Sequence, residues 1–448
     1  MRDNRILIRC LRNIIKTKKA KRRGMIKPVD YYRRRRAKLI SDLESSTLAV
    51  FHSNDLMPTN ADGNYPFVQD SNLYYLTGIL QDRTTLIIDK RGENVKEILY
   101  IRYSDEHTKI WEGRKLSQSE ASEISGVEDV RWEKDLEEDL EMLLSNADSV
   151  SALEDYPRRT TPEVYSKNKR FVEYLKKEYP GKGISILNDL LRELRFSKDN
   201  LELGYLQEAC NITAKGFGKV LETIRPGVTE NELQGVYYSE FLKHNAEGFA
   251  YEPIIASGRD ACVLHYVRNN KIIKEESLIL MDVGAKYRHY SADLTRTVPA
   301  SGRFTSRQKQ IYNMVLKAQR HAFSIIRAGK TLKEINAEVG LYIQELLLEH
   351  GLLTIEDINN SSKEAPAYRK YFMHGTCHHL GIDTHDIPSG TEPLKENAVI
   401  TVEPGLYLIE EEIGIRLEND VVVKKDGIVD LMADIPIEAD HIEELMSK

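Results

Sequence analysis

The feature that most limits how this sequence can fold is an acidic residue inside an apolar run. Asp282 follows Leu-Ile-Leu-Met and precedes Val-Gly in a segment of strand length, 277–283. A carboxylate buried in a strand is costly to desolvate unless it is paired or bound to a metal ion. Asp293 comes eleven residues later on a second predicted strand, 292–298, which lets both side chains meet on one face of a hairpin. A local hydrogen bond is the simpler explanation for either residue alone, but two adjacent carboxylates repel each other, and a divalent cation between them removes that repulsion.

Three further candidate ligands lie in the same half of the chain. Glu403 ends the run Ile-Thr-Val and stands directly before Pro-Gly, and Glu418 lies in Gly-Ile-Arg-Leu-Glu. Each alone means little, because glutamates are common on strand edges. His378 belongs to a stretch, 374–385, that holds four of the twelve histidines. Imidazole is the commonest nitrogen ligand of transition metals, so this cluster favours a metal site over structural histidines.

Short motifs in this half resemble those of the pita-bread metallopeptidases, which include methionine aminopeptidase, prolidase and aminopeptidase P. They occur in the family's order, and they are Leu264-His-Tyr266, Asp282-Val-Gly-Ala285, Ala292-Asp-Leu-Thr-Arg-Thr297, His374-Gly-Thr-Cys-His378, His385-Asp386, Glu403-Pro-Gly-Leu-Tyr407 and Gly414-Ile-Arg-Leu-Glu418. The first half resembles the N-terminal domain of aminopeptidase P, through Tyr65-Pro66, Gln69-Asp-Ser-Asn-Leu-Tyr-Tyr-Leu-Thr-Gly78 and Trp111-Glu-Gly-Arg-Lys-Leu116. The resemblance covers nearly everything after Met25 and favours aminopeptidase P over methionine aminopeptidase, which lacks such a domain.

The resemblance implies an α+β protein with two domains. An α/β N-terminal domain is expected over 26–182, and a catalytic pita-bread (creatinase/aminopeptidase-like) domain with a curved antiparallel sheet over 183–448, the boundary lying at Tyr179-Pro-Gly-Lys-Gly183. Residue patterns agree with this order of elements. They predict helices over 31–43, 136–144, 199–224, 305–327 and 331–350, and a further helix beginning at the capping box of Thr229 and Glu232. Further strands are predicted at 47–51, 85–88, 97–102, around His378, and at 398–402, 406–409 and 414–423.

The resemblance also implies a ligand set for two divalent cations. Asp282 would bind one ion, His378 and Glu403 the other, while Asp293 and Glu418 would bridge both. Oxygen ligands with one nitrogen suit Mn(II), with Co(II), Zn(II) or Fe(II) as substitutes.

The activity implied by the resemblance is hydrolysis of the peptide bond between an N-terminal residue and a following proline. Glu403 would carry the proton from water to the leaving nitrogen, and His385 would stabilise the tetrahedral intermediate. The resemblance also implies that His265 and His374 line the substrate pocket and that Tyr407 and Arg416 orient the ligands. Strand packing for Tyr407 and a surface ion pair for Arg416 are equally good explanations.

Two alternatives stay open. Prolidase has the same ligands but cleaves only Xaa–Pro dipeptides, and a metal-free binding module could reuse the fold, although such proteins usually lose ligands that are all present here. One departure from the family pattern is Cys377, where serine is expected, and the simplest interpretation is a small buried residue. The resemblance further implies a homodimer or homotetramer.

The N-terminal extension, residues 1–25, differs from the rest of the chain. Residues 1–24 are rich in Lys and Arg and contain a single acid, Asp3, which fits a flexible tail, a start at Met25, or a mitochondrial presequence. The whole chain has a formal net charge of −6 and gives no reason to expect binding to nucleic acid, and no stretch approaches the roughly 18 apolar residues of a membrane span. The four cysteines are scattered, which indicates a reducing compartment such as the cytoplasm.

Overall fold

The computed structural model describes residues 27–156, 162–387 and 391–447, so the predicted N-terminal extension lies outside the described residues. The chain forms two compact units, an N-terminal unit that ends at Leu194 and a C-terminal unit that begins at Arg195. The expected boundary at 182/183 falls within the first unit. The reason is that strand β6 (Gly183–Ile186) pairs with β5 (Ser149–Ala152) and extends the N-terminal sheet.

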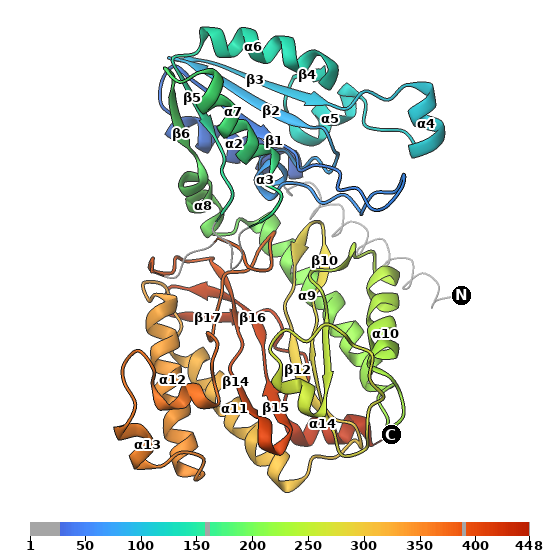
Figure 1. The fold of residues 1–448 in the computed structure, drawn as a ribbon, viewed down its shortest axis with the longest axis vertical. Coiled ribbons are helices and arrows are strands. Elements are labelled where there is room, and N and C mark those ends of the chain that lie inside the picture. Colours follow the sequence, from blue (N-terminus) through green and yellow to red (C-terminus); the bar gives the residue numbers. More distant parts are fainter. Residues whose placement is uncertain (1–26, 157–161, 388–390, 448) are drawn as a thin grey trace, which may run out of the picture. The chain divides into compact units, whose positions relative to one another are not determined.

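The N-terminal unit is built on a six-stranded mixed sheet with the order β4-β3-β2-β1-β5-β6 (Figure 1). The central strands β1 (Thr47–His52), β2 (Thr85–Arg91) and β3 (Asn94–Ile101) pair antiparallel, and β4 (Asp129–Trp132), β5 and β6 join in parallel. This confirms the predicted α/β character. Its helices are α2 (Pro28–Asp42), α3 (Ser71–Thr77), α4 (Glu106–Glu112), α5 (Gln118–Ser125), the short η1 (Glu133–Asp135), α6 (Leu136–Asn146) and α7 (Lys167–Glu178). The boundary between the two units falls within helix α8 (Asn188–Phe196).

The C-terminal unit combines helices with antiparallel sheets. The strands are β7 (Gly248–Phe249), β8 (Ile254–Ser257), β9 (Leu278–Asp282), β10 (Ala285–Tyr287), β11 (Tyr290–Ser291), β12 (Thr295–Pro299), β13 (Val399–Val402), β14 (Gly405–Leu408), β15 (Ile413–Arg416), β16 (Asn419–Lys424) and β17 (Gly427–Asp430). The helices are α9 (Asn200–Leu221), α10 (Glu230–Lys243), α11 (Ser306–Ile325), α12 (Leu332–Glu349), α13 (Ile355–Asn359) and α14 (Ala439–Met446), with short helical turns η2 (Gly258–Cys262), η3 (Ala367–Lys370) and η4 (Ile409–Glu411).

The long helices of this unit begin where local sequence dictates. Asp199 caps α9 by accepting hydrogen bonds from the backbone N–H groups of Leu201 and Glu202, and Thr229 caps α10 in a box with Glu232. The same arrangement starts α11 and α12. Among the described helices, none is at once long and apolar enough to cross a lipid bilayer.

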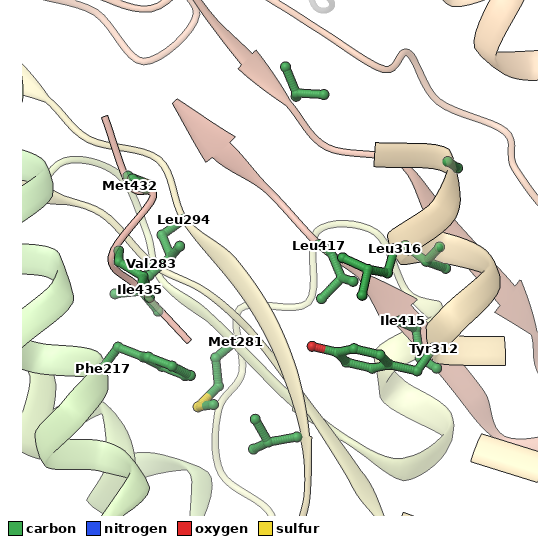
Figure 2. Packing of buried hydrophobic residues seen from close by; sticks show 14 of the residues in the cluster. Phe217, Met281, Val283, Leu294, Tyr312, Leu316, Ile415, Leu417, Met432 and Ile435 are labelled. Carbon is green, nitrogen blue, oxygen red and sulfur yellow. The ribbon is translucent and has the colours of Figure 1, made fainter. Parts of the chain in front are cut away.

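The core beneath the site fixes which side chains can reach it. In extended backbone, successive side chains point to opposite faces. Met281 and Val283 are fully buried in the core on either side of Asp282 (Figure 2). Leu294, between Asp293 and Thr295, is buried in the same core, and so is Leu417, between Arg416 and Glu418. Packing of these apolar side chains therefore directs the alternate polar ones, Asp282, Asp293, Thr295, Arg416 and Glu418, to the other face.

Three predicted strands differ in the structure. The strand predicted at 292–298 begins only at Thr295, because the hairpin of β10 and β11 precedes it, and Asp282 pairs with Thr295. The strand predicted at 414–423 is divided at Leu417-Glu418 between β15 and β16. The segment around His378 is an irregular loop that joins the edge of β13 through the bridge of His379 with Ile400.

Candidate metal centre

The five expected ligands come from separate parts of the C-terminal unit and gather in one place. Nε2 of His378 lies 3.5 Å from Oδ2 of Asp293 and 3.5 Å from Oε1 of Glu403. Asp293, His378 and Glu418 each offer a ligand atom, and these three atoms lie within 4.8 Å of one another. Asp282 joins the group through Tyr251, whose hydroxyl oxygen lies 2.5 Å from Oδ1 of Asp282 and 2.6 Å from Oδ1 of Asp293.

The electrostatics of this cluster fit a divalent cation. Burial raises the pKa of Asp293, and the charge of Asp282 raises it further. Burial likewise raises the pKa of Glu403 to about 7 and that of Glu418 well above its usual range, with neighbouring carboxylates adding to both. These acids cannot all ionise together in a buried site unless positive charge is brought in. A hydroxyl carries one hydrogen, so the two short contacts of Tyr251 also need a further proton or a cation nearby.

The ring of His378 is oriented like that of a metal-binding histidine. Its Nδ1–H donates to the carbonyl oxygen of His379 over 3.0 Å, which leaves Nε2 facing the carboxylates. Burial lowers the pKa of His378, but the hydrogen bond to Asp293 and the charge of Glu403 more than offset this and raise it to about 9. Without a cation, a proton on this ring therefore serves as the counter-charge of the acids.

A buried hydrogen-bond network orients the carboxylates. Arg416 donates from Nη2 to Oδ2 of Asp282 over 2.6 Å and from Nη1 to the hydroxyl of Tyr407 over 2.8 Å. Thr295 donates to Oε2 of Glu418 over 2.6 Å and accepts from Nε of Arg416 over 3.2 Å. Arg416 and Tyr407 are 3% and 1% exposed, so the alternative of a surface ion pair is wrong for Arg416.

His374 and His385 lie beside the same cluster. Tyr407 O–H donates to Nε2 of His374 over 2.7 Å, while Nδ1–H of that ring donates to the carbonyl of Gly375. Burial and then the charge of Arg416 lower the pKa of His374 to about 3, so this imidazole is neutral, and the nearby charge of His265 acts in the same direction. The rings of His378 and His385 meet edge to face with centroids 4.4 Å apart.

Sequence reasoning missed three supporting residues. Tyr251 stands in no recognisable motif, and nothing local marks it. Asp420 accepts the backbone N–H of Asp293 over 3.0 Å and the thiol of Cys210 over 3.3 Å. Its position two residues after Glu418 could have indicated a side chain on the same face. Thr295, at the same spacing from Asp293, could have been found in the same way.

Cys377 is buried in the core, as a small residue at that position was expected to be. It lies in the irregular loop before His378 and not on a strand. Burial, followed by the charges of Glu403 and Glu418, raises the pKa of its thiol well above the usual range. The thiol therefore stays protonated and is a poor metal ligand.

The loop that carries His385 is held by its neighbour Asp386. Lys198 donates from Nζ to Oδ2 of Asp386 over 2.8 Å, and Arg195 donates to its other carboxylate oxygen. All three side chains are buried. Gly381 is required beside them, because a Cβ there would lie 2.3 Å from Oδ2 of Asp386. The buried ion pairs thus fix the backbone directly after His385.

Replacing Tyr251 by phenylalanine is expected to weaken divalent-metal binding roughly 10- to 100-fold while leaving the fold intact, because only the hydroxyl that orients Asp282 and Asp293 is lost. Titration of the metal-depleted protein with Mn(II), followed by calorimetry, measures this. Tyr238→Phe, at an exposed tyrosine of the same unit, is the control. Equal affinity in the two variants would mean that Tyr251 has no part in holding the cluster.

Comparison with known proteins finds relatives for both halves of the chain. Residues 204–425 match the sequence model of metallopeptidase family M24, and residues 32–151 match that of the aminopeptidase P N-terminal domain. The Xaa-Pro aminopeptidase of Haemophilus influenzae is 31% identical over 434 residues, which are 94% of this chain and 98% of that protein. Xaa-Pro aminopeptidase 3 of Homo sapiens is 30% identical over 93% of this chain and 86% of its own length. The solved structure of zinc-substituted Escherichia coli aminopeptidase P in complex with product superposes with a TM-score of 0.85 at 29% identity, covering 95% of this chain and 99% of that one.

Proposed function

The chain belongs to metallopeptidase family M24, among the members with an aminopeptidase P N-terminal domain, and we propose that it removes the first residue of peptides whose second residue is proline. The family resemblance and the two-part pita-bread fold predicted from the motifs are confirmed. The observation that carries the proposal is the convergence of four carboxylates and one imidazole, distant in sequence, on a single buried site.

The proposed ligands are the five residues of that cluster. Asp282 would serve one divalent cation, His378 and Glu403 a second, and Asp293 and Glu418 both. This division is supported by Asp293, whose Oδ1 contacts the same Tyr251 hydroxyl as Asp282 and whose Oδ2 faces His378. Mn(II) is the proposed ion, since oxygen ligands predominate, with Co(II), Zn(II) or Fe(II) as substitutes.

The bound cations would acidify a water molecule and polarise the peptide carbonyl. Glu403 is the proposed proton carrier, which is supported by its two oxygens, one 3.5 Å from His378 and the other 3.8 Å from His374. It would accept the proton of the attacking water and deliver it to the proline nitrogen as that nitrogen leaves. His385, exposed beside His378, would donate a hydrogen bond to the oxyanion of the intermediate.

His265 and His374 are proposed to line the substrate pocket, with Tyr407 and Arg416 holding the geometry behind them. The neutral ring of His374 fits this role, because it presents no charge to a peptide. An Xaa–Pro bond lacks the N–H that ordinary peptide bonds offer, so a site that asks for no such donor accepts proline.

Assembly and location are proposed as well. A homodimer or homotetramer is proposed from the family, with peptide substrates and no nucleic-acid or membrane partner. A reducing, cytoplasmic location is supported by the free thiols of the described cysteines Cys210, Cys262 and Cys377.

The activity is tested with three peptides, Arg-Pro-Pro, Arg-Ala-Ala and Gly-Pro. Arg-Pro-Pro should be cleaved to arginine and Pro-Pro, and Arg-Ala-Ala should be cleaved about 100-fold less efficiently in kcat/KM. A chelator should abolish the cleavage of Arg-Pro-Pro, and Mn(II) should restore it. Cleavage of the dipeptide Gly-Pro alone would identify a prolidase instead, and the absence of any hydrolysis by the metal-loaded protein would favour the binding-module alternative.

A further inference from the structure

The N-terminal unit contains a cavity of about 560 Å³ that lies apart from the metal-centre residues in the chain. It is lined by His52 at the end of β1, by residues 133–144 from η1 and α6, and by residues 167–174 from α7. Its volume lies within the range of small-molecule sites. None of the roles assigned above uses these residues.

The floor of this N-terminal cavity is apolar. Leu136, Leu140 and Leu144 are spaced four residues apart and so lie on one face of α6. Phe171 and Tyr174 contribute rings from α7, stacked with centroids 6.3 Å apart. Surface of this kind favours an aliphatic or aromatic side chain, which gains by leaving water.

Cationic side chains lie on the α7 side of the cavity. Arg170 donates from Nη2 to both carboxylate oxygens of Asp55 over 3.0 Å. Lys167, one turn earlier, makes no hydrogen bond or ion pair with any residue in the described part of the chain. Lys167 is half-buried, and this burial lowers the pKa of its ammonium. An ammonium in this condition gains more from an anionic partner than one in open solvent does.

A buried imidazole adds a second polar group. His52 is 3% exposed, and its Nδ1 lies 3.0 Å from Oγ1 of Thr85. Its Nε2 makes no hydrogen bond within the residues described, and the residue lines the cavity. Burial lowers the pKa of His52 to about 3, with the charges of Lys167 and Arg170 adding to the effect. The ring is therefore neutral, and Nε2 can meet a ligand atom without adding charge.

Anionic side chains of the lining come from η1 and α6. Glu133, Glu137 and Glu141 recur every four residues through η1 and α6, so they share one face. Lys134, also in the lining, has its Nζ 5.7 Å from the centroid of the Tyr103 ring and is engaged there. The cavity thus has cations from one helix, anions from another and an apolar floor.

We infer that the N-terminal cavity binds a small zwitterion with an apolar side chain, an α-amino acid of the leucine type. Its carboxylate would pair with Lys167 and meet Nε2 of His52, its ammonium would pair with the glutamates, and its side chain would lie on the leucines of α6. A simple carboxylate would leave the acidic side without a partner, and a simple amine would leave Lys167 without one. The inference does not depend on the proposed function, although an enzyme that releases amino acids would meet such ligands constantly.

Calorimetric titration of the full-length, metal-loaded protein with L-leucine tests this inference. Saturable binding is expected, and 4-methylpentanoate and isopentylamine, which each lack one of the two charges, should bind about tenfold more weakly. Lys167→Met and Glu137→Gln should each weaken leucine binding by about tenfold as well. Lys177→Met, at a residue of α7 whose side chain is 82% exposed, is the matched control and should change nothing.

Two results would overturn the inference. One is the absence of saturable leucine binding. The other is binding that Lys167→Met and Glu137→Gln leave unchanged, which would place the amino acid elsewhere, for example at the metal centre. Glu137 is exposed on α6, so Glu137→Gln still tests the cavity even where the change at Lys167 impairs folding.

Discussion

Replacing Asp293 by alanine should remove bound metal and lower kcat/KM for Arg-Pro-Pro roughly 10³-fold or more. This carboxylate lies 2.6 Å from the hydroxyl of Tyr251 and 3.5 Å from Nε2 of His378, so it joins the two halves of the cluster. Its loss leaves too few shared donors to hold two cations close together. Elemental analysis of the purified protein, together with initial rates on the tripeptide, measures both effects.

The control for this change is Asp434→Ala, an exposed aspartate of the same unit, which should keep its metal and its rate. Unaltered metal content and full turnover in Asp293→Ala would contradict the assignment of the cluster as the catalytic centre. Loss of activity with full metal content would instead give Asp293 a role in catalysis other than metal binding.

The second large effect is expected from a single added methyl group at Gly284. A Cβ built there would lie 1.7 Å from the carbonyl oxygen of Ala292 and 2.6 Å from its carbonyl carbon. These are backbone atoms, so no change of side-chain rotamer can relieve the overlap. The two backbone segments that carry Asp282 and Asp293 must therefore move apart. We expect Gly284→Ala to lower the free energy of unfolding by about 3 kcal/mol or more and to weaken metal binding.

Thermal unfolding checks this, with a decrease of about 6 °C or more expected in the midpoint. Gly218→Ala, in the interior of α9, is the matched control, because its added Cβ meets nothing within 4 Å. Alanine there should be neutral or stabilise by up to about 1 kcal/mol through helix propensity. A Gly284→Ala protein that melts like the parent chain would show that the backbone around the centre adapts easily.

Local signals in the sequence were sufficient to predict much of the fold. The capping box of Thr229 and Glu232 predicted where α10 begins, because a cap is a contact within a few residues. The apolar runs around Asp282 and Glu403 predicted β9 and β13 for a similar reason. The predicted pairing of the strands around Asp282 and Asp293 is confirmed, but the short strands β10 and β11 between them were not predicted, since they carry no strong pattern of their own.

The gathering of the candidate ligands was predictable from motifs, but the residues that orient them were not. Tyr251 reaches Asp282 and Asp293 across 31 and 42 positions of sequence, and its neighbours give no hint of this. The pairing of Asp386 with Lys198 spans 188 positions. Such contacts follow from packing of the whole unit, which no local pattern encodes. The cavity between α6 and α7 is of the same kind, because its charges converge only after both helices pack.

The buried contacts of Asp386 set the minimum length of any autonomous catalytic fragment. The match to the M24 sequence model begins at residue 204, after both Arg195 and Lys198. A fragment cut at that point would keep the cluster and His385 but would leave Asp386 as a buried anion with no counter-charge, a defect that costs several kcal/mol in folded proteins. The bounds of the M24 sequence model are therefore narrower than the portion of the chain that a catalytic fragment needs, which begins before Arg195.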